Sequence, residues 1–224
     1  LIPADILHVV FHHFPEIPQP LATRGAMNVL MEIGSSNPAS GIADDTGETP
    51  LQTIMQETLA TAFEDGLVID ATIATSEAQR EALWDVRENA PESHKRSRGV
   101  ARSDISLAQS SLAPFYEDMV AAVKTVDPTI RICGYGHLGD GNLHFNLVAD
   151  ERSNSEFDSK KDQLYELIYE HVAKYNGSIS AEHGIGQTKR AQLAKVKAPE
   201  VLDVMRAIKA SIDPKNLMNP GKVI

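Results

Sequence analysis

The sequence has little cysteine and no long apolar run, and each shortage excludes a class of protein. Its single cysteine, Cys133, cannot close a disulfide within the chain, so we expect a reducing compartment, most simply the cytoplasm. No apolar stretch reaches the roughly 18 residues that would suggest a membrane span. No basic-then-apolar targeting segment precedes the first helix, and because the chain starts at Leu1 we expect a trimmed piece.

Basic residues are also in short supply, with 21 lysines and arginines against 31 aspartates and glutamates. The formal charge of −10 argues against a protein that binds nucleic acid or an anionic membrane non-specifically, because its field repels polyanions. An anionic substrate would therefore need a local basic cluster. The remaining composition, 42% hydrophobic and 23% charged, is that of a folded globular domain rather than a disordered chain.

The apolar pattern divides the 224 residues into three parts. Residues 1–25 predict an N-terminal helix, ended by prolines, and a linker. Residues 26–176 alternate β-type and helical runs, and we expect them to form one ferredoxin-like domain. Residues 177–224 predict a short strand, a glycine-rich turn and a C-terminal helical segment.

The order of these runs predicts the fold class. They predict helices at 51–64, 77–88, 114–126 and 155–175, and strands at 28–33, 67–73, 103–107, 130–137, 142–148 and 178–181. The strand-helix-strand-strand-helix order is typical of ferredoxin-like lobes. The sequence therefore predicts an α+β fold, in which two ferredoxin-like lobes form one antiparallel-rich sheet covered by helices.

Residues 134–146 carry the clearest chemical signal. Within them, Asp140-Gly141 is typical of a two-residue hairpin turn, because both positions tolerate positive φ. A turn centred there pairs His137 directly with His144. Directly opposed residues have Cβ atoms roughly 4.5–5.5 Å apart, which lets two imidazoles bind one ion. Asn146 shares their face of the hairpin, and Leu143 and Phe145 point the other way, towards a core.

Two histidines on a zinc-like ion are usually joined by a third protein ligand. Glu182 is the best candidate, because it lies in residues 180–186, where glycines permit close approach of the backbone. The residues therefore predict a divalent-metal site, most simply for zinc, made by His137, His144 and Glu182. A purely structural histidine pair stays open as the alternative.

These residues, together with Asn219-Pro220-Gly221-Lys222 near the end, resemble the C-terminal domain of FAD-linked oxidases of the vanillyl-alcohol-oxidase type. Within that type, the sequence is most similar to D-2-hydroxyglutarate and D-lactate dehydrogenases and the glycolate oxidase flavoprotein subunit. The resemblance covers nearly the whole chain. It implies an FAD-linked 2-hydroxy acid dehydrogenase of which this chain is only part, because the flavin-binding N-terminal domain is absent from it.

The resemblance also implies roles for single residues and partners for the chain. It implies that Asn146 and His183 face the substrate and the flavin ring, and that Asn219 is a late flavin contact. FAD would be held mostly by the N-terminal FAD-binding domain, towards which residues 177–224 return. The other partners implied are a small 2-hydroxy acid and an electron acceptor, either a protein or a quinone. The oligomeric state is left open, with a homodimer as one option.

The same resemblance implies that two arginines bind the substrate. Arg87 would grip a substrate carboxylate. Arg102 stands in Arg102-Ser103-Asp104, where the 2-hydroxyglutarate enzymes show lysine in a Lys-x-Asp pattern, and arginine offers a planar fork in place of a point charge. Arg102 also belongs to a basic cluster that includes Lys95. The simpler interpretation of this cluster is a solvated surface loop.

We therefore expect oxidation of a D-2-hydroxy acid, such as D-2-hydroxyglutarate, D-malate or D-lactate, to the 2-oxo acid. Hydride would pass to FAD, and His183 would take the hydroxyl proton. Two other classes stay open. One is a stand-alone divalent-metal hydrolase, and the other is a non-catalytic binding module in which the metal only stabilises the fold.

Overall fold

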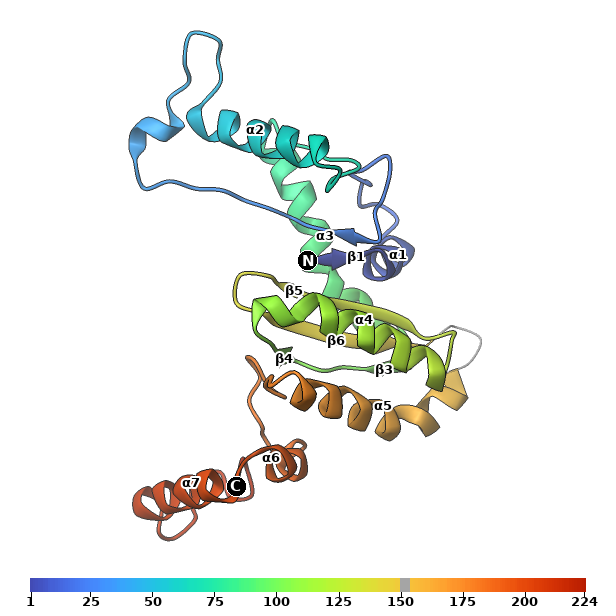
Figure 1. The fold of residues 1–224 in the computed structure, drawn as a ribbon, viewed down its shortest axis with the longest axis vertical. Coiled ribbons are helices and arrows are strands. Elements are labelled where there is room, and N and C mark those ends of the chain that lie inside the picture. Colours follow the sequence, from blue (N-terminus) through green and yellow to red (C-terminus); the bar gives the residue numbers. More distant parts are fainter. Residues whose placement is uncertain (150–153) are drawn as a thin grey trace. The chain divides into compact units, whose positions relative to one another are not determined.

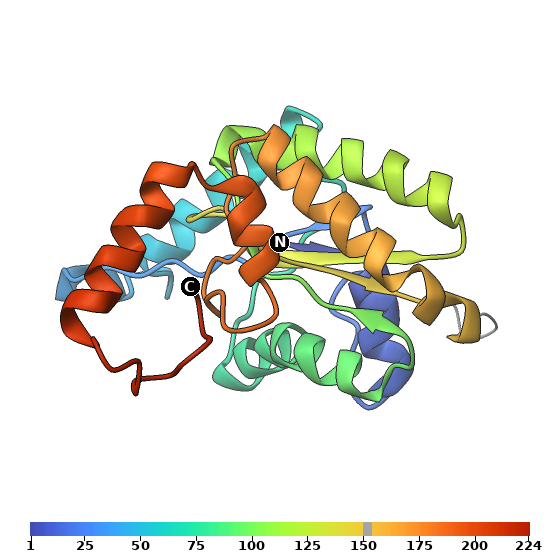
Figure 2. The same ribbon diagram turned by 90° about the horizontal axis from the view of Figure 1, so that it is seen from below.

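The computed structural model describes residues 1–149 and 154–224, and the chain divides into two compact units, Leu1–Arg96 and Ser97–Ile224 (Figure 1, Figure 2). The fold is mixed α+β, with about 49% helix and small antiparallel sheets, which confirms the broad fold class. Among the helices of the described residues, none has both the length and the apolar character needed to cross a membrane. The domain boundaries at residues 25 and 176 stay a prediction.

The first unit is mainly helical. Its core lies where the first helix packs against the third, with Ile6, Val10, Val86 and Ala90 buried. A two-stranded antiparallel pair opens the unit. Its elements are β1 (Ile2–Pro3), α1 (Ala4–His13), β2 (Met27–Asn28), the 3₁₀ turn η1 (Pro38–Gly41), α2 (Pro50–Glu64) and α3 (Glu77–Arg96).

The strands predicted at 28–33 and 67–73 are wrong. In the first range the structure keeps only Asn28 in a strand, as the last residue of Met27–Asn28, and in the second range it keeps none. Apolar side chains of both segments are exposed, Val29 by 61% and Ile69 by 64%. Strand preference is realised only when a neighbouring strand and a packed face are present, and the described residues give neither segment such a neighbour over its length.

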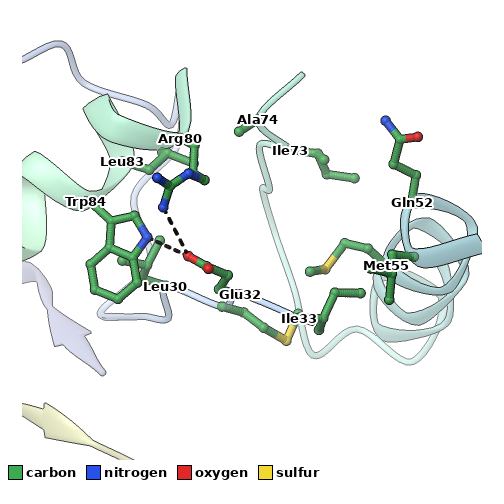
Figure 3. Close-up of a pocket in the computed structure, with 12 residues that line it drawn as sticks. Leu30, Glu32, Ile33, Gln52, Met55, Ile73, Ala74, Arg80, Leu83 and Trp84 are labelled. Atoms are coloured by element: carbon green, nitrogen blue, oxygen red, sulfur yellow. Dashed lines mark hydrogen bonds and ion pairs between the residues drawn. The ribbon is translucent and has the colours of Figure 1, made fainter. Parts of the chain in front are cut away.

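An apolar pocket of about 210 Å³ lies in this first unit, between α2, α3 and the two extended segments (Figure 3). At its edge the Trp84 indole donates to Glu32 at 2.7 Å, and Arg80 lies 3.6 Å from the same carboxylate. This ion pair is exposed, and it contributes little to stability.

The second unit contains a four-stranded antiparallel sheet centred on one strand. β6 pairs on one side with β5 and on the other with both β3 and β4, which lie end to end along it (Figure 1). The elements are β3 (Val100–Ala101), β4 (Ile105–Ser106), α4 (Gln109–Val126), β5 (Arg131–His137), β6 (Asn142–Val148), α5 (Asn154–Lys174), α6 (Arg190–Val196) and α7 (Pro199–Ile212).

The strand-helix-strand-strand-helix order predicted for residues 103–175 is confirmed in this unit. The predicted strand at 178–181 is reduced to an isolated bridge between Ser106 and Ser178. The described residues form two separate small sheets, so they do not show two ferredoxin-like lobes joined in one sheet.

α4 and α5 lie side by side over one face of this sheet (Figure 2). Phe145 of β6 meets the rings of Phe115 and Tyr116 of α4 edge to face, with centroids 5.5 and 5.6 Å apart. Gly134 of β5 makes room for them, because a Cβ there would lie 2.8 Å from both Phe145 and Tyr116. With one face of the sheet committed to this core, its polar residues fall on the other face.

Candidate functional site

The two strands of the hairpin pair in a register that differs from the predicted one. Tyr135, not His137, lies opposite His144, and His137 lies opposite Asn142. The predicted direct pairing of the two histidines is therefore wrong by two residues. A shift of two preserves the faces of both strands. His137 and His144 still share one face, but as diagonal neighbours, whose spacing is roughly 7–8 Å in a regular sheet.

The turn explains this register. It has four residues, 138–141, instead of the two that Asp140-Gly141 predicts. The Asp140 carboxylate accepts the Asn142 amide at 3.0 Å, and Gly141 has a φ of 72°. The tip is also tied to a distant residue, because Leu107 donates its amide to the Gly141 carbonyl, and a Cβ on Gly141 would overlap the Leu107 carbonyl oxygen.

Residues 102–104, between β3 and β4, keep the register of the strands around them. Ala101 pairs with Leu147 and Ile105 with Leu143, which places Asp104 opposite His144 and Arg102 opposite Asn146. The ladder is interrupted by side chains, because the Ser103 amide donates to the Asn146 side chain and its hydroxyl to the Phe145 carbonyl. The contact of Asp104 with His144 shows that Asp104 shares the polar face with the histidines, and the spacing predicts the same face for Arg102.

Asp104 binds the glutamate-histidine-glycine corner through its carboxylate. The backbone amides of Ala181, Glu182 and His183 all donate to Asp104 Oδ2, at 3.1, 2.8 and 2.8 Å. The side chain is 2% exposed. Burial acts to raise the pKa of Asp104, but the amides of His183 and Glu182 and the charges of His183 and Lys189 hold that pKa below its usual value. Asp104 is therefore an anion.

The Lys189 ammonium also supports the corner. It donates to the carbonyls of Ile179 at 2.7 Å and of Asp104 at 3.4 Å. Burial lowers the pKa of Lys189, and the charge of Asp104 opposes that change. The corner is thus fixed by one buried anion and one half-buried cation.

His144 lies at the centre of the site. Its Nδ1 is 3.8 Å from Asp104 Oδ1, and its Nε2 is 3.9 Å from Glu182 Oε2. The His183 ring stacks on it with centroids 5.7 Å apart, and the Tyr135 ring is 5.3 Å away. The structure therefore brings Glu182 and His183 to His144.

The residues fit a divalent ion in kind. His144 and Glu182 present an imidazole nitrogen and a carboxylate to one another, and His137 supplies a second imidazole on the same face. Buried polar atoms lie beside them. Asp104 Oδ1 and both polar atoms of the Asn142 side chain have no hydrogen-bond partner among the described residues. Within those residues, no three potential ligands converge closely enough to hold an ion. Metal binding by these three residues stays a prediction.

The other residues with predicted roles are placed as follows. Asn146 is buried on the polar face, and Arg102 is exposed. Asn219 has a φ of 47° in a terminal turn, which returns to the glycine-rich loop through a 2.8 Å bond from the Val223 amide to the Gly186 carbonyl. Arg87 lies on α3 in the first unit. Their roles stay predictions.

Asp104 is the residue that sequence reasoning missed as part of the site. The sequence does contain an indication of this role, because Arg102 and Asp104 alternate in an extended segment and therefore share a face. What the sequence does not show is the return of residues 181–183, which are 77 to 79 positions away, onto that carboxylate.

Comparison with known proteins gives consistent matches. Residues 43–223 match the family model described as FAD linked oxidases, C-terminal domain. The chain is 34% identical over 209 residues to a D-2-hydroxyglutarate dehydrogenase of Stutzerimonas stutzeri, covering 93% of this chain and 42% of that protein. It is 32% identical over 219 residues to the mitochondrial enzyme of Arabidopsis thaliana, covering 97% and 36%. The match to the Bos taurus enzyme is 38% over 167 residues, covering 74% and 29%. The chain thus spans less than half the length of these relatives.

Proposed function

Because the chain belongs to the family of FAD-linked oxidase C-terminal domains, we propose that it is the substrate- and metal-binding part of an FAD-dependent D-2-hydroxy acid dehydrogenase. The observation that supports this proposal is the group around His144, whose ring nitrogens lie 3.8 Å from Asp104 and 3.9 Å from Glu182, on the sheet face that Asn146 shares. Family membership favours this function over a stand-alone hydrolase or a non-catalytic module. The two ferredoxin-like lobes of the predicted fold remain part of the proposal.

Two groups from outside the chain complete the chemistry. FAD, held mostly by the N-terminal domain with Asn219 as a late contact, would accept the hydride from the substrate carbon. A divalent cation, most simply zinc, held by His137, His144 and Glu182 would act as a Lewis acid and lower the pKa of the substrate hydroxyl. A protein or a quinone would then reoxidise the flavin.

His183 is the proposed base for the hydroxyl proton. Its side chain is 67% exposed, so it is accessible to a substrate, and its Nδ1 lies 3.7 Å from Asp104 Oδ2. A carboxylate beside Nδ1 favours the hydrogen on that nitrogen and leaves Nε2 to accept a proton. Asn146, anchored by the Ser103 amide, would hold the substrate's polar groups on the same face. Such fixed orientation can supply several kcal/mol of the barrier.

The substrate we propose is a D-2-hydroxy dicarboxylate. Relatives that are named D-2-hydroxyglutarate dehydrogenases match at 32 to 38% identity, and Arg102 lies opposite Asn146. One carboxylate would be neutralised by the metal and Arg87. A second cation facing only a methyl group would gain no partner, whereas a distal carboxylate suits the arginine fork.

Steady-state kinetics with D-2-hydroxyglutarate, D-malate and D-lactate test this choice. Arg102→Met should cost on the order of 2–4 kcal/mol in kcat/KM for the dicarboxylates, as for a broken charge pair, and much less for D-lactate. Arg98→Met is the matched control, because Arg98 is an exposed arginine outside the sheet. Equal damage towards all three acids would show that Arg102 does not bind the distal carboxylate.

Flavin reduction tests the reaction itself. The protein expressed from its complete gene should be yellow, and anaerobic D-2-hydroxyglutarate should bleach its flavin absorbance. A colourless protein, or a flavin that none of the three acids reduces, would refute the proposed function.

A further inference from the structure

Asp104 contacts two parts of the site that are far apart in the sequence. One oxygen, Oδ2, accepts three backbone amides from residues 181–183, and the other, Oδ1, points to the ring of His144. We propose that Asp104 is a positioning residue, which fixes the neutral His144 ring with its hydrogen on Nδ1 and anchors the Glu182 corner with the same carboxylate.

The first step of the argument is the direction of the two ring nitrogens. Nδ1 of His144 faces Asp104 Oδ1 at 3.8 Å, whereas Nε2 faces Glu182 Oε2 at 3.9 Å. A carboxylate accepts hydrogen bonds and cannot donate them. The nitrogen beside the more deeply buried anion is therefore the one that carries the hydrogen. Asp104 is 2% exposed and Glu182 is 51% exposed, so water screens Glu182 far more than Asp104.

The second step concerns the free oxygen of Asp104. Oδ1 is buried and has no hydrogen-bond partner among the described residues. A buried carboxylate oxygen without a donor is costly, and the His144 Nδ1–H is a donor directed at it. The 3.8 Å separation is longer than a hydrogen bond, and a closure of roughly 1 Å would form one.

The third step compares the groups that surround the His144 ring. The His183 ring stacks on the His144 ring with centroids 5.7 Å apart, and the Tyr135 ring is tilted by 48° against it with centroids 5.3 Å apart. Asp104 Oδ1 and Glu182 Oε2 lie within 4 Å of the two nitrogens of the His144 ring, and Asp104 is the buried one of these two carboxylates.

The consequence for activity rests on the proposed function. With the hydrogen on Nδ1, the lone pair of Nε2 points towards Glu182. It is then available to bind the metal ion that His144 and Glu182 would share. A carboxylate that fixes the ring of a metal-binding histidine in this way typically contributes 10–100-fold to metal affinity.

Asp104→Asn is the decisive variant, because the amide keeps the shape of the carboxylate. Its oxygen would accept the backbone amides of residues 181–183, so its NH₂ group would face His144 and donate to Nδ1. The hydrogen of the neutral ring would then move to Nε2. Asp127→Asn is the matched control, because Asp127 is also a buried, charge-paired aspartate of this unit. It lies shortly before the first residue of β5, whereas the site lies at the last residues of β5.

The measurement is the nitrogen chemical shifts of the His144 ring. They would be recorded by NMR on metal-free protein with ¹⁵N-labelled histidine side chains, expressed from the complete gene, at a pH of about 8.5, where an unperturbed imidazole is neutral. A His144→Gln variant assigns the signal. We expect Nδ1–H in the wild type and in Asp127→Asn, and Nε2–H in Asp104→Asn.

A wild-type ring with its hydrogen on Nε2, or an Asp104→Asn ring that keeps it on Nδ1, would overturn the inference. If Asp104→Asn fails to fold, the wild-type spectrum still decides, since the proposal requires Nδ1–H there. Titration with Zn²⁺ then separates this inference from the proposed function. Roughly 10–100-fold weaker binding in Asp104→Asn supports both. Absence of zinc binding in the wild type would refute the metal site and leave the ring result standing.

Discussion

The β5–β6 hairpin and the extended segments 28–33 and 67–73 are all apolar runs of the kind that predicts strands, but only the hairpin forms a ladder. The hairpin closes locally over a four-residue turn, and α4 and α5 cover its apolar face. Apolar side chains of the two segments instead stay exposed, including Leu67 at 78%. Alternation therefore predicts which side chains share a face, whereas a nearby partner decides whether a strand forms.

The comparison also explains where the chemistry lies. A sheet whose apolar face is packed must place its polar residues on the other face, and there His144 meets Asp104 and Glu182. In the first unit, the corresponding apolar side chains line a pocket with an exposed ion pair at its edge (Figure 3). Rigid packing on one face is what gives the second unit a defined site.

The two regions should differ most in the loss of stability when an aromatic ring is removed. Phe145→Ala deletes a side chain that is 0% exposed and should cost about 3–5 kcal/mol of unfolding free energy. Phe63→Ala makes the same change on α2, where the ring is 43% exposed, and should cost less than about 1 kcal/mol. Urea denaturation followed by circular dichroism compares them. Similar losses would mean that the two regions are equally packed.

The turn of the hairpin offers a sharper test. Gly141→Ala should cost on the order of 2–4 kcal/mol, because the residue has positive φ and its Cβ would overlap the Leu107 carbonyl. Gly139→Ala, in the same turn, meets nothing within 4 Å and should be within about 1 kcal/mol of the wild type. Equal tolerance of both changes in thermal unfolding would disprove the observed turn.

The loop before β5 should show a dependence on pH. Hydrogen bonds from Thr129 and Lys160 lower the pKa of Asp127 to about 2. Its stabilising effect is therefore complete above the unfolded value of about 3.9 and is lost as the pH falls through about 2. Asp127→Asn should cost about 1–2 kcal/mol at pH 7. Chemical denaturation across pH should show the deficit vanishing in acid; a deficit independent of pH would contradict this pKa.

The exposed helix α2 should give the smallest effect. Thr49 caps it by accepting the Gln52 amide, and the Gln52 side chain accepts the Thr49 amide in return. Thr49→Ala should cost about 1 kcal/mol, since α2 has no buried residue to compensate. Hydrogen exchange should quicken in the first turn of α2 only. Faster exchange in β5 or β6 as well would show that the two regions are coupled.

The sequence predicted the second unit better than the first. The faces of the hairpin came out right, because period-two alternation survives a two-residue shift. The register did not, because the turn length depends on the Asp140 side chain and on contact with Leu107, which no local pattern records. The predicted strands at 28–33 and 67–73 failed for the same reason, since a strand needs a partner.

The sequence singles out two residues that lie close together in the candidate site, but not the residue that supports them. His144 and Glu182 were singled out by residue type and by glycines nearby, and they lie 3.9 Å apart. Asp104 went unrecognised because its role depends on a corner almost eighty residues later folding back onto it. Long-range contacts of this kind leave no spacing that a single sequence can show.

The metal content of the protein expressed from its complete gene tests the central claim most directly. Elemental analysis should find one divalent ion per chain in the wild type and almost none in His144→Ala or Glu182→Ala, with flavin retained in both. His171→Ala, which removes a histidine on α5 that bonds the Leu167 carbonyl, should keep the ion. Full metal occupancy in His144→Ala would contradict the proposed site.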